Sequence, residues 1–196
     1  MIKTLDIEAR LSAAAPSGIQ FTQDTNQHGV SCAWCVLANH EELLALAAYL
    51  KALAARLSTI TVFQPKAPAM PTPVEGQPEP LPATFFGGVE NGGKAYEVDY
   101  HFDLDGDTLT LVVHVPAGGA VESLTKLFRG ADWPEREIME IYALEVVHHP
   151  DPRRLFLDPG IESSVLERLI PLSTLANSAT TKGLWEKIMA QTEKTS

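Results

Sequence analysis

Residues Ala131–Pro159 read ADWPEREIMEIYALEVVHHPDPRRLFLDP, and this stretch organises the rest of the chain. It opens on a helix-start pattern, places acids and an arginine side by side, and ends in a His-His-Pro-Asp-Pro-Arg-Arg run. Charged groups are costly to bury unless they are paired, and these stand among Trp133, Tyr142 and Phe156. The stretch therefore either faces a partner or forms an internal lattice of ion pairs.

The first half of this stretch predicts a capped helix. Asp132 suits the N-cap position, and Glu135 follows at the spacing of a capping box, in which the two side chains satisfy the first amides. Pro134 is tolerated there because first-turn amides have no intrahelical partner. Arg136 and Glu140 are spaced i,i+4, which favours an ion pair on the helix surface.

The second half supplies cations for Glu135, which lies at the margin of the apolar stripe of this helix. Arg153 and Arg154 are the nearest candidates in sequence, and arginine suits a partly buried carboxylate. On this interpretation the stretch is a corner clamp that locks the helix to a strand. The alternative is that Glu135, His149 and Arg153 form the catalytic cluster of a free-standing enzyme.

The composition of the whole chain narrows the classes of partner. Its 196 residues suffice for one core, and its formal net charge of −10 argues against nucleic acid or an anionic membrane surface. The chain has two cysteines, acids where a signal peptide would need an apolar core, and no apolar run near the roughly 18 residues of a membrane span. We therefore expect a cytoplasmic protein that reaches a membrane only through a partner.

Hydrophobic periodicity predicts an α+β fold, with a mixed or antiparallel sheet, helices packed on one face, and an irregular C-terminal extension. We expect an N-terminal segment (1–27), an α+β domain (28–160) with a proline-rich insertion (64–82), and a C-terminal helical tail (161–196). The predicted strands are 18–22, 30–37, 58–63, 85–90, 94–102 and 108–115, and the predicted helices are 5–15, 41–57, 122–128, 162–170 and 182–191.

Two local patterns fix the ends of these elements. Asn39 and Glu42 have capping-box spacing at the start of helix 41–57. The run DLDGD at 103–107 predicts the hairpin turn between the last two strands, with Gly106 at a positive φ. Its three aspartates also imitate the start of a calcium loop, but the rest of that loop is absent, so a turn is the better interpretation.

Two further motifs invite a functional interpretation and lack support. Cys32 and Cys35 match C-x-x-C, but residues i and i+3 on a strand point to opposite faces, so we expect buried structural cysteines. Gly118 and Gly119 precede a predicted helix, where phosphate can bind, but they belong to neither nucleotide-binding pattern.

The adjacent histidines near the end of the stretch raise the question of metal binding. His148 and His149 are neighbours on an extended segment, so their side chains are expected to point to opposite sides. This arrangement favours a hydrogen-bonded structural or interface role over metal ligation.

The stretch 131–159, called the signature segment below, resembles the signature of the 30 kDa subunit family of respiratory complex I, whose bacterial members are the C subunits of NADH:quinone oxidoreductase. The family pattern runs W-x-E-R-E, then Asp or Glu, an aromatic residue and glycine, and later G-H-P-D-x-R-R. This chain departs from the pattern at three positions. Glu140 stands where the family usually has Asp, Ala143 stands in place of the glycine after the aromatic residue, and His148 stands in place of the glycine before His-Pro. The matching residues are Trp133, Glu135, Arg136, Glu137, His149, Pro150, Asp151, Arg153 and Arg154.

The resemblance implies a protein without catalytic, cofactor-binding or metal-binding residues of its own, in a membrane-associated NADH:quinone oxidoreductase. The matching residues, together with Glu140, would form a partner interface or a structural cluster. Its partners would be the large quinone-site subunit, or a nickel–iron hydrogenase-like counterpart, and iron–sulfur subunits. Iron–sulfur clusters, flavin or a nickel–iron centre would belong to those partners.

The resemblance also implies a cytoplasmic position, peripheral to the cell membrane through the complex. Two alternatives stay open at this point. One is the equivalent subunit of an energy-converting hydrogenase or formate hydrogenlyase. The other is a soluble adaptor that binds through the proline-rich loop.

Overall fold

The computed structural model describes residues 6–65, 95–142 and 144–159, and in these ranges it has an α+β fold with a five-stranded sheet and a two-stranded sheet. The order in the large sheet is β1-β2-β5-β4-β3, with β2 and β5 parallel and the other neighbours antiparallel. The predicted mixed sheet is thus confirmed. The strands are β1 (Ile19–Thr25), β2 (Ser31–Leu37), β3 (Arg56–Phe63), β4 (Ala95–Leu104) and β5 (Asp107–Pro116).

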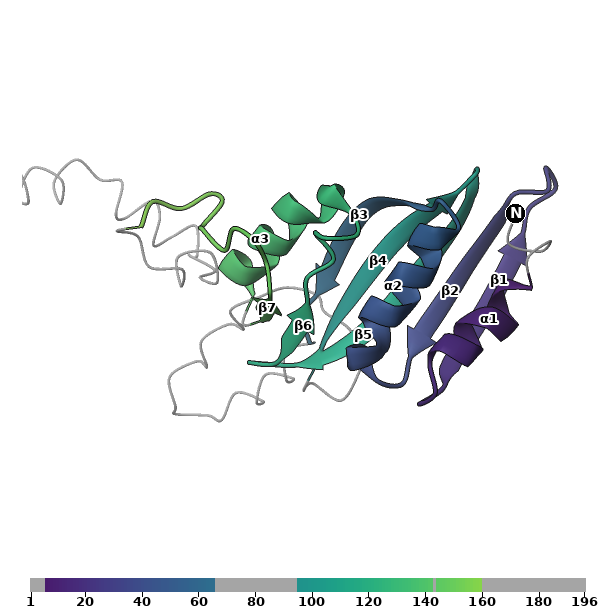
Figure 1. Cartoon of the computed structure of the whole chain (residues 1–196), viewed down its shortest axis with the longest axis horizontal. Helices are drawn as coiled ribbons and strands as arrows, with labels where there is room; N and C mark the ends of the chain where they lie inside the picture. The colour runs from purple at the N-terminus through teal and green to yellow at the C-terminus, as the bar shows by residue number, and fades with distance from the viewer. Residues whose placement is uncertain (1–5, 66–94, 143, 160–196) are drawn as a thin grey trace, which may run out of the picture.

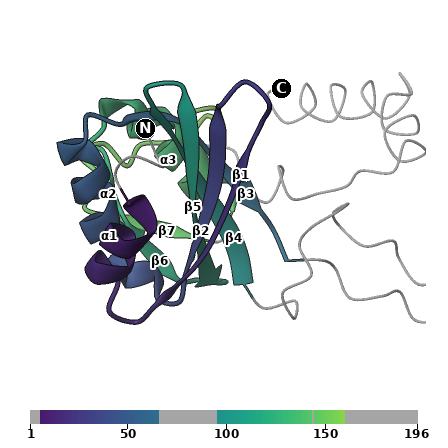
Figure 2. The same cartoon turned by 90° about the vertical axis from the view of Figure 1, so that its right-hand side faces the viewer.

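The helices cover one face of this sheet, as predicted. Figure 1 shows α1 (Ile7–Ala14) and α2 (Leu43–Ala52) lying across the strands, and Figure 2 shows both helices and α3 (Asp132–Ile141) on the same side. Period-two alternation directs one set of strand side chains towards the helices, where they join one core. The largest fully buried side chains of that core include Leu11, Leu43, Leu46, Leu50, Tyr100, Phe102 and Leu111.

The hairpin of β4 and β5 forms where the DLDGD run predicts it. Asp105 and Gly106 have φ values of 56° and 89°, so both central turn residues are left-handed. That geometry matches the twist of the flanking strands, which is why Asp-Gly is a strong hairpin signal. The prediction of a turn at this run is confirmed.

The helix predicted over 41–57 is shorter than its leucine spacing suggests. A 3₁₀ helix, η2 (His40–Glu42), leads into α2, which ends at Ala52, and Leu57 lies buried in β3. Ala54, with φ at 59°, ends the helical backbone. Leu57 continues the helical spacing of the leucines, but the same residue can also be the buried side chain of a strand. Asn39 accepts the N–H of Glu41 as a cap, but Glu42 accepts the N–H of Ser17 at 3.0 Å, so the predicted capping box is wrong.

The helix predicted over 122–128 is also wrong, and this change positions the candidate site. Strand β6 (Ala120–Glu122) pairs in parallel with β7 (Glu145–Val147), and a second 3₁₀ helix, η3 (Arg129–Ala131), leads into α3. Residues 123–128 form a turn instead of a helix, because Ser123 and Leu124 direct their donors to a side chain of α3. Both α3 and β7 of the signature segment therefore contact the chain that follows β5.

Several predictions fall outside the described residues: most of the proline-rich insertion, strand 85–90, Ala143, and the helices at 162–170 and 182–191. Within the described ranges, no helix has the length and apolar character needed to span a bilayer.

Candidate functional site

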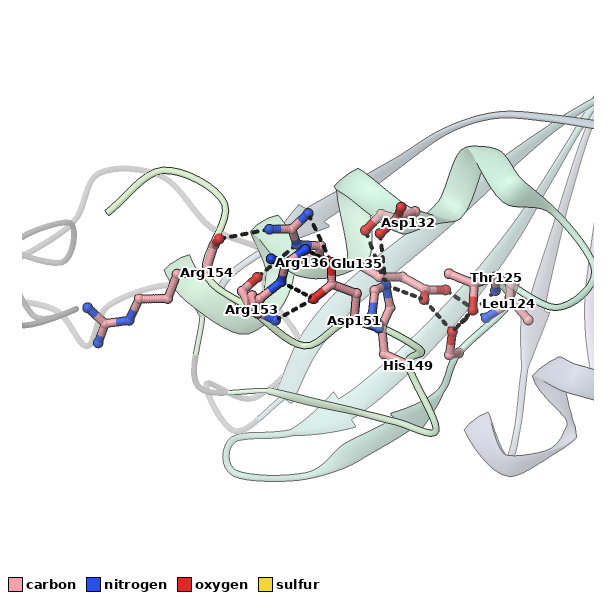
Figure 3. Close-up of polar contacts among 10 residues, drawn as sticks. Leu124, Thr125, Asp132, Glu135, Arg136, His149, Asp151, Arg153 and Arg154 are labelled. Carbon is pink, nitrogen blue, oxygen red and sulfur yellow. Dashed lines mark hydrogen bonds and ion pairs between the residues drawn. The ribbon is translucent and has the colours of Figure 1, made fainter. Parts of the chain in front are cut away.

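Glu135 is the buried centre of the signature segment. It is 0% exposed, its Oε2 accepts the hydroxyl of Ser123 at 2.6 Å, and its Oε1 accepts the N–H of Leu124 at 2.7 Å (Figure 3). Burial raises the pKa of Glu135 to about 7, although the bonds from Ser123 and Leu124 favour the carboxylate. Thr125 supports Ser123 through a 2.6 Å contact between their hydroxyls. Glu135 thus joins α3 to the turn after β6.

His149 lies beside this carboxylate in one tautomer. Its side chain is fully buried, and its Nδ1 accepts the N–H of Asp151 at 3.1 Å. The ring proton therefore lies on Nε2, which faces the carbonyl of Asp132 at 3.3 Å and Glu135 Oε2 at 3.8 Å. His148 projects outward with a 69% exposed side chain, so the prediction that the two histidines diverge is confirmed.

Arg136 fastens α3 to the segment that follows β7. Its Nε and Nη2 donate to the carbonyls of Arg153 and Arg154, each at 2.8 Å. Asp151 accepts two 2.6 Å bonds from Arg153, and its other neighbour is Arg136 at 3.9 Å. The two-point hydrogen bond from Arg153 holds the pKa of Asp151 well below its usual range.

Glu140 binds backbone rather than an arginine. Its carboxylate accepts the N–H groups of Leu155, Phe156 and Leu157 at 2.9, 2.8 and 2.6 Å. Burial alone would raise the pKa of Glu140, but these three donors and the charge of Arg154 outweigh it and lower the pKa. The carboxylate thereby sets the path of residues 155–157.

Three predicted contacts of α3 are wrong. No side chain caps the N-terminus of α3, because Glu135 turns inward to the buried donors of Ser123 and Leu124 instead of completing a capping box. Arg136 and Glu140 bind different parts of the following segment rather than each other. Glu135 takes neither Arg153 nor Arg154, because it lies inside the fold while Arg153 lies on the surface, with an 81% exposed side chain.

Two large aromatic side chains lie on the outside of this cluster. Trp133 is 67% exposed and Phe156 is 61% exposed, although both belong to the signature segment. Glu137 is exposed on the same helix. The buried polar side chains of α3 are therefore bound within the fold, while Trp133 and Phe156 face solvent.

The cysteine and glycine motifs have structural roles in the described part of the chain. On β2, Cys35 is buried and Cys32 is half-buried on the opposite face, and burial raises the pKa of Cys35 to about 12. Gly118 is left-handed in the turn after β5, and a Cβ on Gly119 would lie 2.7 Å from the carbonyl of Pro116. Among the described residues, no group of three or more His, Cys, Asp or Glu side chains could hold a metal ion.

A second polar cluster, which the sequence did not indicate, lies on the sheet face opposite the helices. His101 bridges the hydroxyls of Thr61 and Thr110 at 2.9 and 3.0 Å. Asp99 is 9% exposed, and its Oδ1 has no hydrogen-bond partner within the described ranges. Burial, followed by the charge of Glu97, raises the pKa of Asp99 to about 6. The alternation of residues along β4 could have indicated which side chains share this face of the sheet, but it does not show which of these polar side chains are buried.

The family assignment follows from comparison with known sequences. A model of the family described as "Respiratory-chain NADH dehydrogenase, 30 Kd subunit" matches residues 36–175, well over half of the chain. The chain belongs to this family. The matched range includes the whole signature segment, so the resemblance found in the sequence is confirmed.

Relatives of this 30 kDa subunit family member belong to bacterial respiratory enzymes. The C subunit of NADH-quinone oxidoreductase from Mesorhizobium japonicum is 37% identical over 82 residues, 41% of each chain. Its counterpart from Rhodopseudomonas palustris is 42% identical over 89 residues, 43% of this chain and 44% of its own length. The matches thus span less than half the length of these relatives.

One solved structure aligns with most of this chain at low similarity. A chain in the structure of the membrane-bound sulfane sulfur reductase, an archaeal respiratory membrane complex, aligns with 83% of this chain and 81% of its own length. The TM-score is 0.45 at 10% identity, a level of likeness that supports no conclusion about function.

Proposed function

We propose that this 30 kDa family member is a structural subunit of a membrane-associated NADH:quinone oxidoreductase of the complex I type. In this role it packs against the large quinone-site subunit through the surface of its signature segment. Iron–sulfur clusters and flavin belong to the partner subunits, and the chain is cytoplasmic and peripheral to the cell membrane through the complex. The family match and the names of the bacterial relatives support this assignment.

One observation carries the proposal: Glu135, Arg136 and Glu140 are bound within the fold, while Trp133 and Phe156 face outward. Glu135 and Glu140 have their carboxylates occupied by donors of the chain itself. Trp133, Phe156 and Arg153 are all more than half exposed. Tryptophan, other aromatics and arginine dominate the energetics of protein–protein interfaces. The segment therefore has the composition of a docking surface on a rigid base.

The same geometry argues against a free-standing enzyme built on Glu135, His149 and Arg153. A substrate cannot reach Glu135 or His149, whose side chains are fully buried. Arg153 points outward and is held by Asp151. The three groups thus lack a common accessible space in which a reaction could take place.

Affinity purification of the tagged full chain from its native membranes, solubilised in a mild detergent, tests the proposal. We expect recovery of a large quinone-site subunit together with iron–sulfur subunits. A nickel–iron hydrogenase-like large subunit would instead assign the chain to the hydrogenase branch. Recovery of the chain alone would refute the proposal.

A matched pair of tryptophan variants tests the docking surface. Trp133→Ala should reduce partner recovery, whereas Trp34→Ala should leave it unchanged. Trp34 is a suitable control because it is 45% exposed and lies on β2, away from the signature segment. If partner recovery falls with Trp34→Ala and not with Trp133→Ala, the interface lies on the face of the sheet opposite the helices.

A further inference from the structure

Three arginines of the signature segment line one hollow on its surface. The hollow has a volume of about 600 Å³ and is lined by Arg136, Arg153, Arg154, Leu157 and Pro159, which together we call the arginine pocket. This volume lies within the range of pockets that hold small ligands or several side chains. In a chain with a net charge of −10, a hollow lined by three arginines is a local reversal of charge.

Arg136 and Arg153 have one nearby carboxylate, that of Asp151, between them. Arg136 and Arg153 both approach Asp151, whose two oxygens are already taken by the 2.6 Å bonds from Arg153. Arg136 is 13% exposed and lies 3.9 Å from Asp151, so its charge is largely removed from water without a close carboxylate. Glu140 is turned to backbone N–H groups. Two guanidinium groups thus share one carboxylate at the wall of the hollow.

The walls of the pocket indicate which anion would enter. Leu157 and Pro159 supply apolar lining, and the exposed ring of Phe156 is adjacent in the chain. An acidic side chain carried on a protein segment can meet the guanidinium groups while its flanking residues cover this apolar surface. An anionic membrane is a poorer match, because its headgroup layer supplies negative charge without apolar groups that would cover Leu157 and Pro159.

We propose that the arginine pocket binds a carboxylate from an acidic segment of the partner protein. This inference rests on the proposed function, since it specifies which chemistry of the partner meets the signature segment. Arg153 makes the main contact, because its side chain is 81% exposed and its bonds to Asp151 use Nε and Nη2, so that Nη1 can donate to an incoming carboxylate. Arg136, held by the carbonyls of Arg153 and Arg154, keeps the base of the pocket positive.

Titration of the purified full chain with a hexaglutamate peptide tests the pocket directly. At about 0.1 M salt, charges more than about 10 Å apart are screened, so the acidic remainder of the chain contributes little. We expect binding by the wild type and about tenfold weaker binding by Arg153→Gln. Arg56→Gln is the matched control, since Arg56 has a 73% exposed side chain and pairs with Asp103 at 3.7 Å on the hairpin side of the sheet.

Each outcome of this titration decides the proposal. Weaker binding by Arg153→Gln with unchanged binding by Arg56→Gln supports the pocket. An equal loss in both variants, or no loss in either, overturns it. Arg153→Lys keeps the positive charge but loses the planar guanidinium, so its binding should lie between that of the wild type and that of Arg153→Gln. Binding to phosphatidylserine vesicles that depends on Arg153, without binding to the peptide, would replace the protein partner by a membrane and overturn the proposal.

The membrane purification separates failure of the pocket from failure of the proposed function. If partners are recovered with the wild type and lost with Trp133→Ala but not with Arg153→Gln, the subunit role stands and the pocket proposal falls. If the wild type recovers no partner, the subunit role falls, and the peptide titration still decides whether the pocket binds carboxylates.

Discussion

Ser123 Oγ lies 2.6 Å from Glu135 Oε2, and this bond joins the turn after β6 to the first half of α3. The N–H of Leu124 completes the contact at 2.7 Å, so both oxygens of a fully buried carboxylate have donors. The bond explains why residues 123–128 do not form a helix: Ser123 and Leu124 direct their donors to a side chain of α3. It also makes the stability of this part of the fold dependent on the charge of Glu135.

Glu135→Gln should change how the free energy of unfolding depends on pH. Because burial raises the folded-state pKa from 4.5 to about 7, the folded chain keeps a proton that the unfolded chain loses in this window. The stabilising contribution of Glu135 is therefore complete below about pH 4.5 and is lost as the pH rises towards about 7. The neutral amide cannot titrate. The free energy of unfolding of the variant, measured by urea unfolding, should therefore rise relative to that of the wild type as the pH increases across this range.

The control for this prediction is Glu137→Gln, an exposed change on the same helix. If Glu135→Gln and the wild type show parallel pH profiles between pH 4.5 and 7, the raised pKa is not the cause of the pH dependence.

Asp99→Asn should stabilise the chain at neutral pH. The folded-state pKa of Asp99 is raised from 3.8 to about 6, so its ionised form is destabilised by burial, and this loss of stability develops as the pH rises through that window. Replacing the carboxylate by an amide should raise the free energy of unfolding by about 1–2 kcal/mol at pH 7.5. Thermal unfolding at pH 3.5 and 7.5 checks this, with Asp103→Asn on the same strand as control. A gain of equal size at both pH values would contradict the role of ionisation.

Glu140→Gln should loosen residues 155–157. The carboxylate accepts three backbone N–H groups, whereas the amide offers one oxygen and turns an NH₂ group towards the remaining donors. We expect amide hydrogen exchange at Leu155, Phe156 and Leu157 to become at least about tenfold faster. The exposed change Glu137→Gln should leave these amides protected, and unchanged exchange in Glu140→Gln would show that another contact sets this path.

His148→Gly should stabilise the chain. His148 has a φ of 60°, a left-handed backbone that glycine adopts without strain, and the family pattern has glycine at this position. Against this gain stands the loss of an exposed contact with Glu122 at 2.9 Å, which contributes little. We expect a net gain of about 0.5–1 kcal/mol in urea unfolding. His148→Ala, which removes the same contact but keeps a Cβ, should show no gain.

The strands of the large sheet and the hairpin of β4 and β5 could be predicted from local patterns, whereas the strand order, with β2 parallel to β5, could not. Alternation along β4 and β5 and the Asp-Gly turn between them specify the hairpin without reference to the rest of the chain. Strands of three residues, such as β6 and β7, carry no periodic signal, so their parallel pairing could not be foreseen. The turn at 123–128 was missed for the same reason.

The sequence could predict that the charged residues of the signature segment have polar partners, but not which residues those partners are. The sequence indicated a cationic partner for Glu135 and an ion pair between Arg136 and Glu140. It also offered two interpretations of the stretch, one of which was an internal lattice of ion pairs. Nearness in sequence favoured Arg153 as the partner of Glu135, but the partner is Ser123, twelve residues before Glu135. The pairing of β6 with β7 holds the chain around Ser123 against the signature segment. Such a pairing depends on tertiary structure and cannot be predicted from the spacing of residues along the chain.

The contact between Glu140 and residues 155–157 has a consequence for sequence variation in this family member. Glu140 binds N–H groups, which every residue except proline possesses, so the side chains at these positions are free to change without releasing the segment. Proline at 155, 156 or 157 is the substitution that removes a bond. The exposed ring of Phe156 can therefore be exchanged to suit a different partner surface while the backbone that presents it stays in place.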